Sequence, residues 1–152
     1  MPKLSCNTQN IETYERELYL QSAASILDCV SDANPDPELL DILGKYLSAQ
    51  GSKPMTECVH NPHSPFLLLS EVQDCLGWDK LVEGHISTLW LEVMSPYLSD
   101  TGRKSITKWG CRFIDSLLSL THKQWILRNS KVHYATKGLT ASHQDKLVLN
   151  VR

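Results

Sequence analysis

The chain has 152 residues, 41% of them hydrophobic, which suits one domain with a sizeable core. Its first residues contain no apolar run typical of a signal peptide, and no stretch of about 18 uncharged apolar residues predicts a membrane span. The five cysteines are irregularly spaced and form no CxxC pair, which argues against a disulfide framework and a zinc ribbon. We therefore expect one intracellular domain over residues 1–152, cytoplasmic or nuclear, with reduced thiols and no membrane contact.

The charge is divided unequally along the chain. Residues 1–100 hold 5 Lys or Arg and 15 Asp or Glu, whereas residues 101–152 hold 10 and 2. A formal net charge of −2 therefore hides about −10 followed by about +8. This asymmetry predicts either an acidic partner for the basic third of the chain or neutralisation of one part by the other.

The first predicted helix runs over residues 11–33, because its apolar residues recur at intervals near three and four. Residues 1–9 are expected to be a flexible N-terminus. The helix must end before the Asn34-Pro35 pair, since the residue before a proline is biased away from the helical conformation.

The second predicted helix begins at a strong start signal. Asp36 can cap the free amides, and Pro37 fits the first helical position. This helix should end near Gly51, and residues 52–63 are expected to be a loop.

Shorter helices are predicted over residues 65–76, over residues 78–81 and between Ser87 and Pro96. A serine that can cap precedes the first and third, a glycine suited to left-handed backbone ends the first and second, and a proline must kink or end the third. These signals come from Ser64-Pro65, Gly77, Gly84, Ser87 and Pro96. Because no alternating strand pattern competes, we predict an all-α, single-domain irregular bundle of about five to seven helices.

The longest predicted helix covers residues 102–134 and lies in the C-terminal half of the chain. Its apolar residues share one broad arc, and basic residues form a stripe on the opposite arc. Such a stripe could neutralise a few phosphates. The candidate nucleic-acid-binding residues are Lys104, Lys108, Arg112 and Lys123, supported by Lys131.

Polar residues reach the apolar arc near the end of this helix. A buried Arg128 would need a carboxylate or several carbonyls as partners. The sequence favours Arg128 as an internal tie of the domain; an anion-binding role and simple exposure are the alternatives. The predicted structural polar cluster consists of Trp125, Arg128, Asn129 and His133.

Four tryptophans could stack on unpaired bases or pack in the core, and their apolar neighbours at helical spacing favour the core for each of them. They are Trp78, Trp90, Trp109 and Trp125.

The loop with Cys58, His60 and His63 is the one segment that looks like a metal site. It lacks a fourth ligand, so a solvated turn is favoured and no metal or cofactor is expected. The chain contains no GxSxG elbow, Gly-rich phosphate loop or HExxH motif. We therefore expect no catalytic residues and a protein that is not an enzyme.

Spaced Gly and Trp positions recur over roughly residues 70–140. They form a pattern of Gln, Gly-Trp, Gly, Ser and Trp, then a later Trp, and Trp-x-x-Arg-Asn with a nearby His. The positions are Gln73, Gly77, Trp78, Gly84, Ser87, Trp90, Trp109, Trp125, Arg128, Asn129 and His133. This pattern resembles a family of largely uncharacterised eukaryotic open reading frames, common in fungi and algae, that are associated with retroelements.

The resemblance implies a retroelement context and no particular activity. The chain departs from the family pattern at Pro96, and it stops at Arg152 just after an apolar stripe begins at Leu147. These departures support the hypothesis of a truncated or decayed copy.

The sequence favours a non-catalytic helical protein-interaction module, a fragment or relative of a retroelement-type protein. Its partner would be an unknown protein or a second copy, bound through the C-terminal helix. The alternative is a weak, sequence-independent nucleic-acid-binding accessory domain that uses the basic stripe of residues 104–131. A pI near 6.3 argues against this alternative. Packing of acidic helix faces beside the basic stripe would also argue against nucleic-acid binding, because it would leave little positive surface for phosphate.

Overall fold

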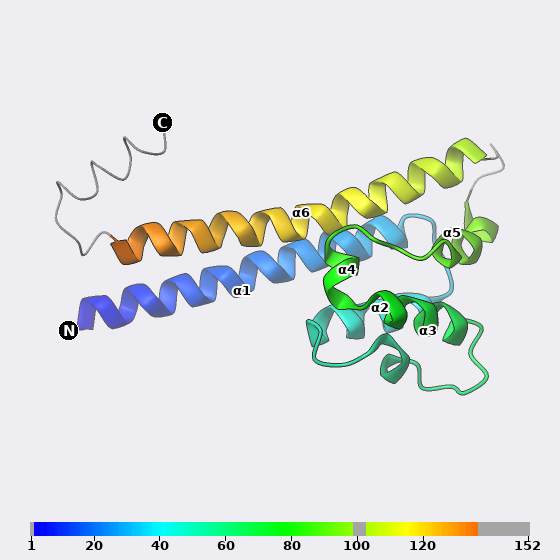
Figure 1. Cartoon of the computed structure of the whole chain (residues 1–152), viewed down its shortest axis with the longest axis horizontal. Coiled ribbons are helices and arrows are strands. Elements are labelled where there is room, and N and C mark those ends of the chain that lie inside the picture. Colours follow the sequence, from blue (N-terminus) through cyan, green and yellow to red (C-terminus); the bar gives the residue numbers. More distant parts are fainter. Residues whose placement is uncertain (1, 99–102, 137–152) are drawn as a thin grey trace.

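The computed structural model describes the backbone of residues 2–98 and 103–136, and the side chains of residues 10, 12–98 and 105–129. Within these ranges every regular element is a helix, which confirms the predicted all-α class. Two long helices, α1 (Pro2–Ser31) and α6 (Arg103–Thr136), lie side by side and run in opposite directions (Figure 1). We call this pair the arm.

Short helices between α1 and α6 pack at one end of the arm and form what we call the head, residues 37–97 (Figure 1). They are α2 (Pro37–Ala49), the 3-10 helix η1 (Met55–Cys58), α3 (Leu67–Leu76), α4 (Trp78–Val82), α5 (Leu89–Met94) and the 3-10 helix η2 (Ser95–Tyr97). None of the described helices is both long and apolar enough to cross a membrane.

Helix α1 differs from its predicted start. It begins at Pro2, so residues that we expected in a flexible N-terminus belong to the helix. The physical reason is that proline is tolerated in the first turn and no glycine or further proline interrupts residues 3–31. The helix ends at Ser31, before Asn34-Pro35, as predicted.

The predicted cap of α2 is confirmed, whereas Ser64 and Ser87 lie before the cap positions of α3 and α5, which Phe66 and Thr88 occupy without a side-chain cap bond. The Asp36 carboxylate accepts a hydrogen bond from the Glu38 amide at 3.0 Å, and Pro37 is the first residue of α2. Ser64 Oγ accepts from the Phe66 amide at 3.1 Å, although regular helix begins only at Leu67. Ser87 Oγ accepts from the Leu89 amide at 3.1 Å.

A glycine lets the loop after α4 approach α6. Gly84 has a φ of +89°, and a Cβ there would lie 3.2 Å from the Ile114 side chain and 3.3 Å from that of Leu118. A side chain at position 84 would therefore be strained and would push the loop away from α6.

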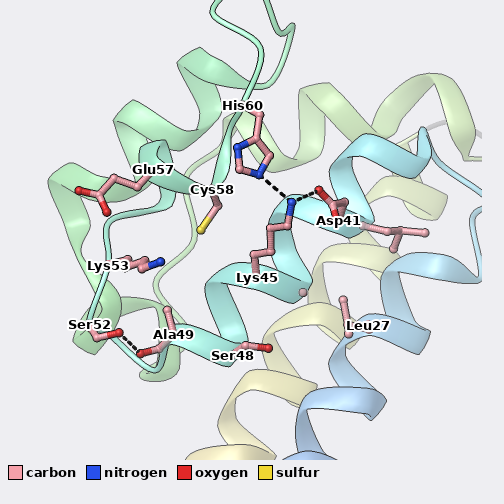
Figure 2. A pocket seen from close by; sticks show the side chains of 12 residues that line it. Leu27, Asp41, Lys45, Ser48, Ala49, Ser52, Lys53, Glu57, Cys58 and His60 are labelled. Carbon is pink, nitrogen blue, oxygen red and sulfur yellow. Dashed lines mark hydrogen bonds and ion pairs between the residues drawn. The ribbon is translucent and has the colours of Figure 1, made fainter.

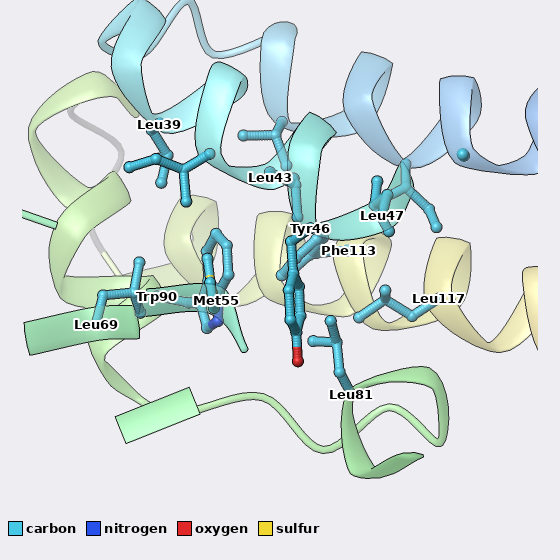
Figure 3. Close-up of a cluster of buried hydrophobic side chains, with 14 of the residues drawn as sticks. Leu39, Leu43, Tyr46, Leu47, Met55, Leu69, Leu81, Trp90, Phe113 and Leu117 are labelled. Atoms are coloured by element: carbon cyan, nitrogen blue, oxygen red, sulfur yellow. The ribbon is translucent and has the colours of Figure 1, made fainter. Parts of the chain in front are cut away.

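The core lies where the head meets the arm, and aromatic rings fill its centre (Figure 3). Phe113 of α6 packs between Trp90 and Trp109, with ring centroids 5.0 and 5.1 Å away. Both tryptophans are fully buried, which confirms their predicted core positions. Trp78 is half-buried and its ring forms a T-shaped pair with that of Tyr46. Trp125 is 60% exposed, so its predicted core position is wrong.

Two buried tyrosines predict loss of stability at high pH. Burial raises the pKa of Tyr19 and of Tyr46 to about 12, while an unfolded tyrosine titrates near pH 10. Because the unfolded chain loses these protons first, the contribution of the two tyrosines to the free energy of unfolding should be constant below about pH 10 and should be lost between about pH 10 and pH 12. Helical circular dichroism and tyrosinate absorbance, followed together against pH, measure this. Complete titration of all tyrosines near pH 10 in the folded protein would contradict it.

Candidate functional site

The basic stripe lies beside the acidic helix α1. Lys108, Arg112 and Lys123 are exposed on α6, whereas the side chains of Lys104 and Lys131 lie outside the described ones. Burial raises the pKa of the Cys29 thiol on α1, Arg112 lowers it and Asp32 raises it further, so both charged groups are near this thiol. The stripe therefore shares its side of the arm with carboxylates.

The predicted polar cluster is not a buried site. Arg128 and Asn129 are exposed, which corrects the predicted burial of Arg128, and the His133 side chain lies outside the described ones. The physical reason is that this part of α6 lies beyond the head and packs on α1, so much of its circumference faces solvent (Figure 1). Trp125 stacks instead on His122, with ring centroids 6.3 Å apart and planes 16° apart.

The candidate metal ligands do not converge. Within the described ranges no three His, Cys, Asp or Glu side chains are placed to hold a metal ion. In an open groove of about 770 Å³ along α2, Lys45 Nζ lies 2.7 Å from His60 Nε2 and 2.8 Å from Asp41 Oδ2 (Figure 2). The ammonium group thus takes the position where a cation would bind His60.

The Cys58 thiol is buried, and burial raises its pKa, which keeps it protonated.

Several positions of the retroelement-like pattern have structural roles in the head. Gln73 is fully buried, and its Oε1 accepts hydrogen bonds from Trp90 Nε1 at 3.0 Å and from the Ser87 amide at 3.2 Å. Its Nε2 donates to the His85 carbonyl at 3.3 Å. Gly77 and Gly84 have φ values of +88° and +89°. These contacts explain the spacing of that part of the pattern by packing alone.

One surface was not predicted from the sequence: the side of the arm opposite the head. On each helix of this surface, residues spaced by three or four point the same way, and all are exposed except the half-buried Ser119. Tyr14 is 58% and Ile126 48% exposed. Because α1 and α6 pack side by side and Arg112 is close enough to the Cys29 thiol of α1 to lower its pKa, the two stripes lie next to each other on the arm. We call this surface the arm face; it comprises Tyr14, Glu17, Gln21, Ser25, Asp28 and Asp32 of α1, and Lys108, Arg112, Asp115, Ser119, Lys123 and Ile126 of α6.

The arm face combines acidic residues on α1 with basic residues on α6. None of its charged side chains forms a salt bridge with another described residue; the pairs found join Lys45 to Asp41 and Lys80 to Glu83. The α6 stripe was visible in the sequence as the polar arc of a long helix. The α1 stripe could have been found in the same way, from its three-and-four spacing.

Comparison with family models, with curated proteins and with solved structures gives no match to this chain. The fold itself defines an all-α domain with a two-helix arm and a small helical head.

Proposed function

We propose that this protein is a non-catalytic helical protein-interaction module and that the arm face is its binding surface. The observation that carries the proposal is the pair of opposite charge rows, one on each helix, that do not join in salt bridges with described residues of their own chain. An exposed Tyr14 beside these rows adds apolar contact area of the kind enriched at interfaces.

The resemblance to retroelement-associated reading frames supplies the proposed context, a relative of a retroelement-type protein. The C-terminal apolar stripe that was expected to support self-association lies outside the described residues. The proposal therefore uses the arm in its place.

Photo-crosslinking in the native cells tests the proposed function. A photoreactive phenylalanine analogue is placed at Gln21 or Ser119 of the arm face, or at Leu68, a 59% exposed head residue that serves as the control. We expect Gln21 and Ser119 to give protein–protein adducts that resist nuclease treatment. Leu68 should give few adducts. Equal yields from all three positions would contradict an interaction surface on the arm.

Binding of nucleic acid through the basic stripe is the weaker candidate. Asp32 and Arg112 both lie near the Cys29 thiol, and a carboxylate on this part of the arm repels phosphate. We expect no saturable binding of mixed-sequence DNA or RNA by fluorescence anisotropy at about 150 mM salt and up to about 50 μM protein. Micromolar binding that is lost in Lys108→Glu/Arg112→Glu/Lys123→Glu would instead favour nucleic acid.

A further inference from the structure

We propose that the partner of the arm face is a second copy of this chain, in a two-fold dimer whose axis runs parallel to the arm. In this dimer α1 of each copy packs over α6 of the other. The inference rests on the proposed function and names the partner of the same surface.

The internal register of the arm sets the pairing. Helices α1 and α6 pack against each other, and Arg112 and Ser116 of α6 are both close enough to the Cys29 thiol of α1 to lower its pKa, so these parts of the two helices are at about the same level. A two-fold axis along the arm keeps every residue at its level and places α1 opposite the partner's α6. Residue 28 then faces the region of the partner's Arg112.

The charge spacing matches this register along the whole arm face. From Tyr14, steps of 3, 11 and 4 residues lead to Glu17, Asp28 and Asp32. From Ile126, the same steps in the opposite direction lead to Lys123, Arg112 and Lys108. In antiparallel helices equal steps keep residues opposite one another, so every acid of this series meets a base.

The resulting contacts are complementary and are repeated by symmetry. Tyr14 faces the partner's Ile126, and the three carboxylates face the partner's Lys123, Arg112 and Lys108. The remaining acid of the face, Asp115, meets the partner's Ser25, which is neutral. An axis perpendicular to the arm would place α1 on α1 and α6 on α6, which sets like charges against each other. The charge pattern therefore selects the parallel arrangement.

The position of the head leaves room for this dimer. Head contacts use other sides of both long helices: the Tyr19 hydroxyl donates to the Leu47 carbonyl, Leu27 lies near Gly44, and Ile114 lies near Gly84. None of these residues belongs to the arm face, and the head lies to one side of the arm (Figure 1). The two heads would point outward.

The size of the arm face predicts a weak dimer. From residue 14 to residue 32 the face is about 27 Å long, and two packed helices are about 20 Å wide. An area of about 500 Å² per copy is below the roughly 800 Å² of a standard interface. We expect a dissociation constant in the micromolar range that rises at least about 10-fold between about 50 and about 500 mM NaCl, because exposed ion pairs are screened.

Two charge-reversed proteins test the proposal by sedimentation equilibrium of the full chain. The acidic-face protein carries Lys108→Glu/Arg112→Glu/Lys123→Glu, and the basic-face protein carries Glu17→Lys/Asp28→Lys/Asp32→Lys. Each alone should be monomeric at concentrations where the wild type is dimeric. Their equimolar mixture should form a heterodimer, because every contact then joins opposite charges again.

A third protein controls for net charge. Lys53→Glu/Lys80→Glu/Arg128→Glu changes three exposed bases outside the arm face and should dimerise like the wild type. Helical circular dichroism verifies that each variant folds. A monomeric wild type at low salt, or a mixture that stays monomeric, would overturn the dimer. Heterologous adducts in the crosslinking experiment would then still support the interaction module, and their absence would remove both.

Discussion

Replacing Gln73 by leucine is expected to lower the free energy of unfolding by about 3–5 kcal/mol. The Gln73 side chain is fully buried and satisfies the Trp90 indole N–H, the Ser87 amide and the His85 carbonyl. Leucine has a similar volume but leaves these groups inside the head without a partner. Urea unfolding followed by circular dichroism measures the loss.

A comparison of two tryptophans separates the hydrogen bond from packing. Trp90 and Trp109 are both fully buried, but no described residue accepts a hydrogen bond from Trp109 Nε1. Trp90→Phe should therefore cost about 1–2 kcal/mol more than Trp109→Phe. The costs of Gln73→Leu and Trp90→Phe should be less than additive in the double variant. Additive costs would show that the Gln73–Trp90 bond contributes nothing.

Truncation of Phe113 to alanine should cost about 3–5 kcal/mol, because it empties the space between Trp90 and Trp109. The loss should also weaken the contact between head and arm, since Phe113 belongs to α6 and Trp90 to α5. Unfolding followed by tryptophan fluorescence reports on both ring neighbours at once.

Two further variants set the scale for this result. Phe113→Leu keeps most of the volume and should cost less than half as much as Phe113→Ala. Leu68→Ala removes a side chain that is 59% exposed and should change the free energy of unfolding by less than about 1 kcal/mol. A similar cost for Phe113→Ala and Leu68→Ala would contradict the aromatic core described above.

The local features of this fold could be predicted from the sequence, because each depends on a few neighbouring residues. Asp36 with Pro37 starts α2, and Gly77 and Gly84 end α3 and α4 with positive φ. The long helix α6 was predicted from its apolar period to within about two residues at either end.

The features that depend on the arrangement of helices could not be predicted. Arg128 shares an angular sector with core residues of α6, yet it is exposed because the head does not reach that part of the helix. Gln73 shows the reverse: a polar residue in an apolar helix indicates neither burial nor its partners, which come from residues 85–90. The arm face could not be predicted because its two charge rows belong to different helices, and the sequence does not show that these helices lie side by side.

The long helix α6 is one unbroken element with two different surroundings. Around Phe113 it is enclosed by α1 and the head, whereas at Trp125 it is supported by α1 and open to solvent. Local opening therefore costs much less free energy at the far end than at the head, and amide hydrogens should exchange progressively faster from residue 113 toward residue 129. The exchange rates of successive amides in α6 thus measure how far the stabilising effect of the core extends along the helix.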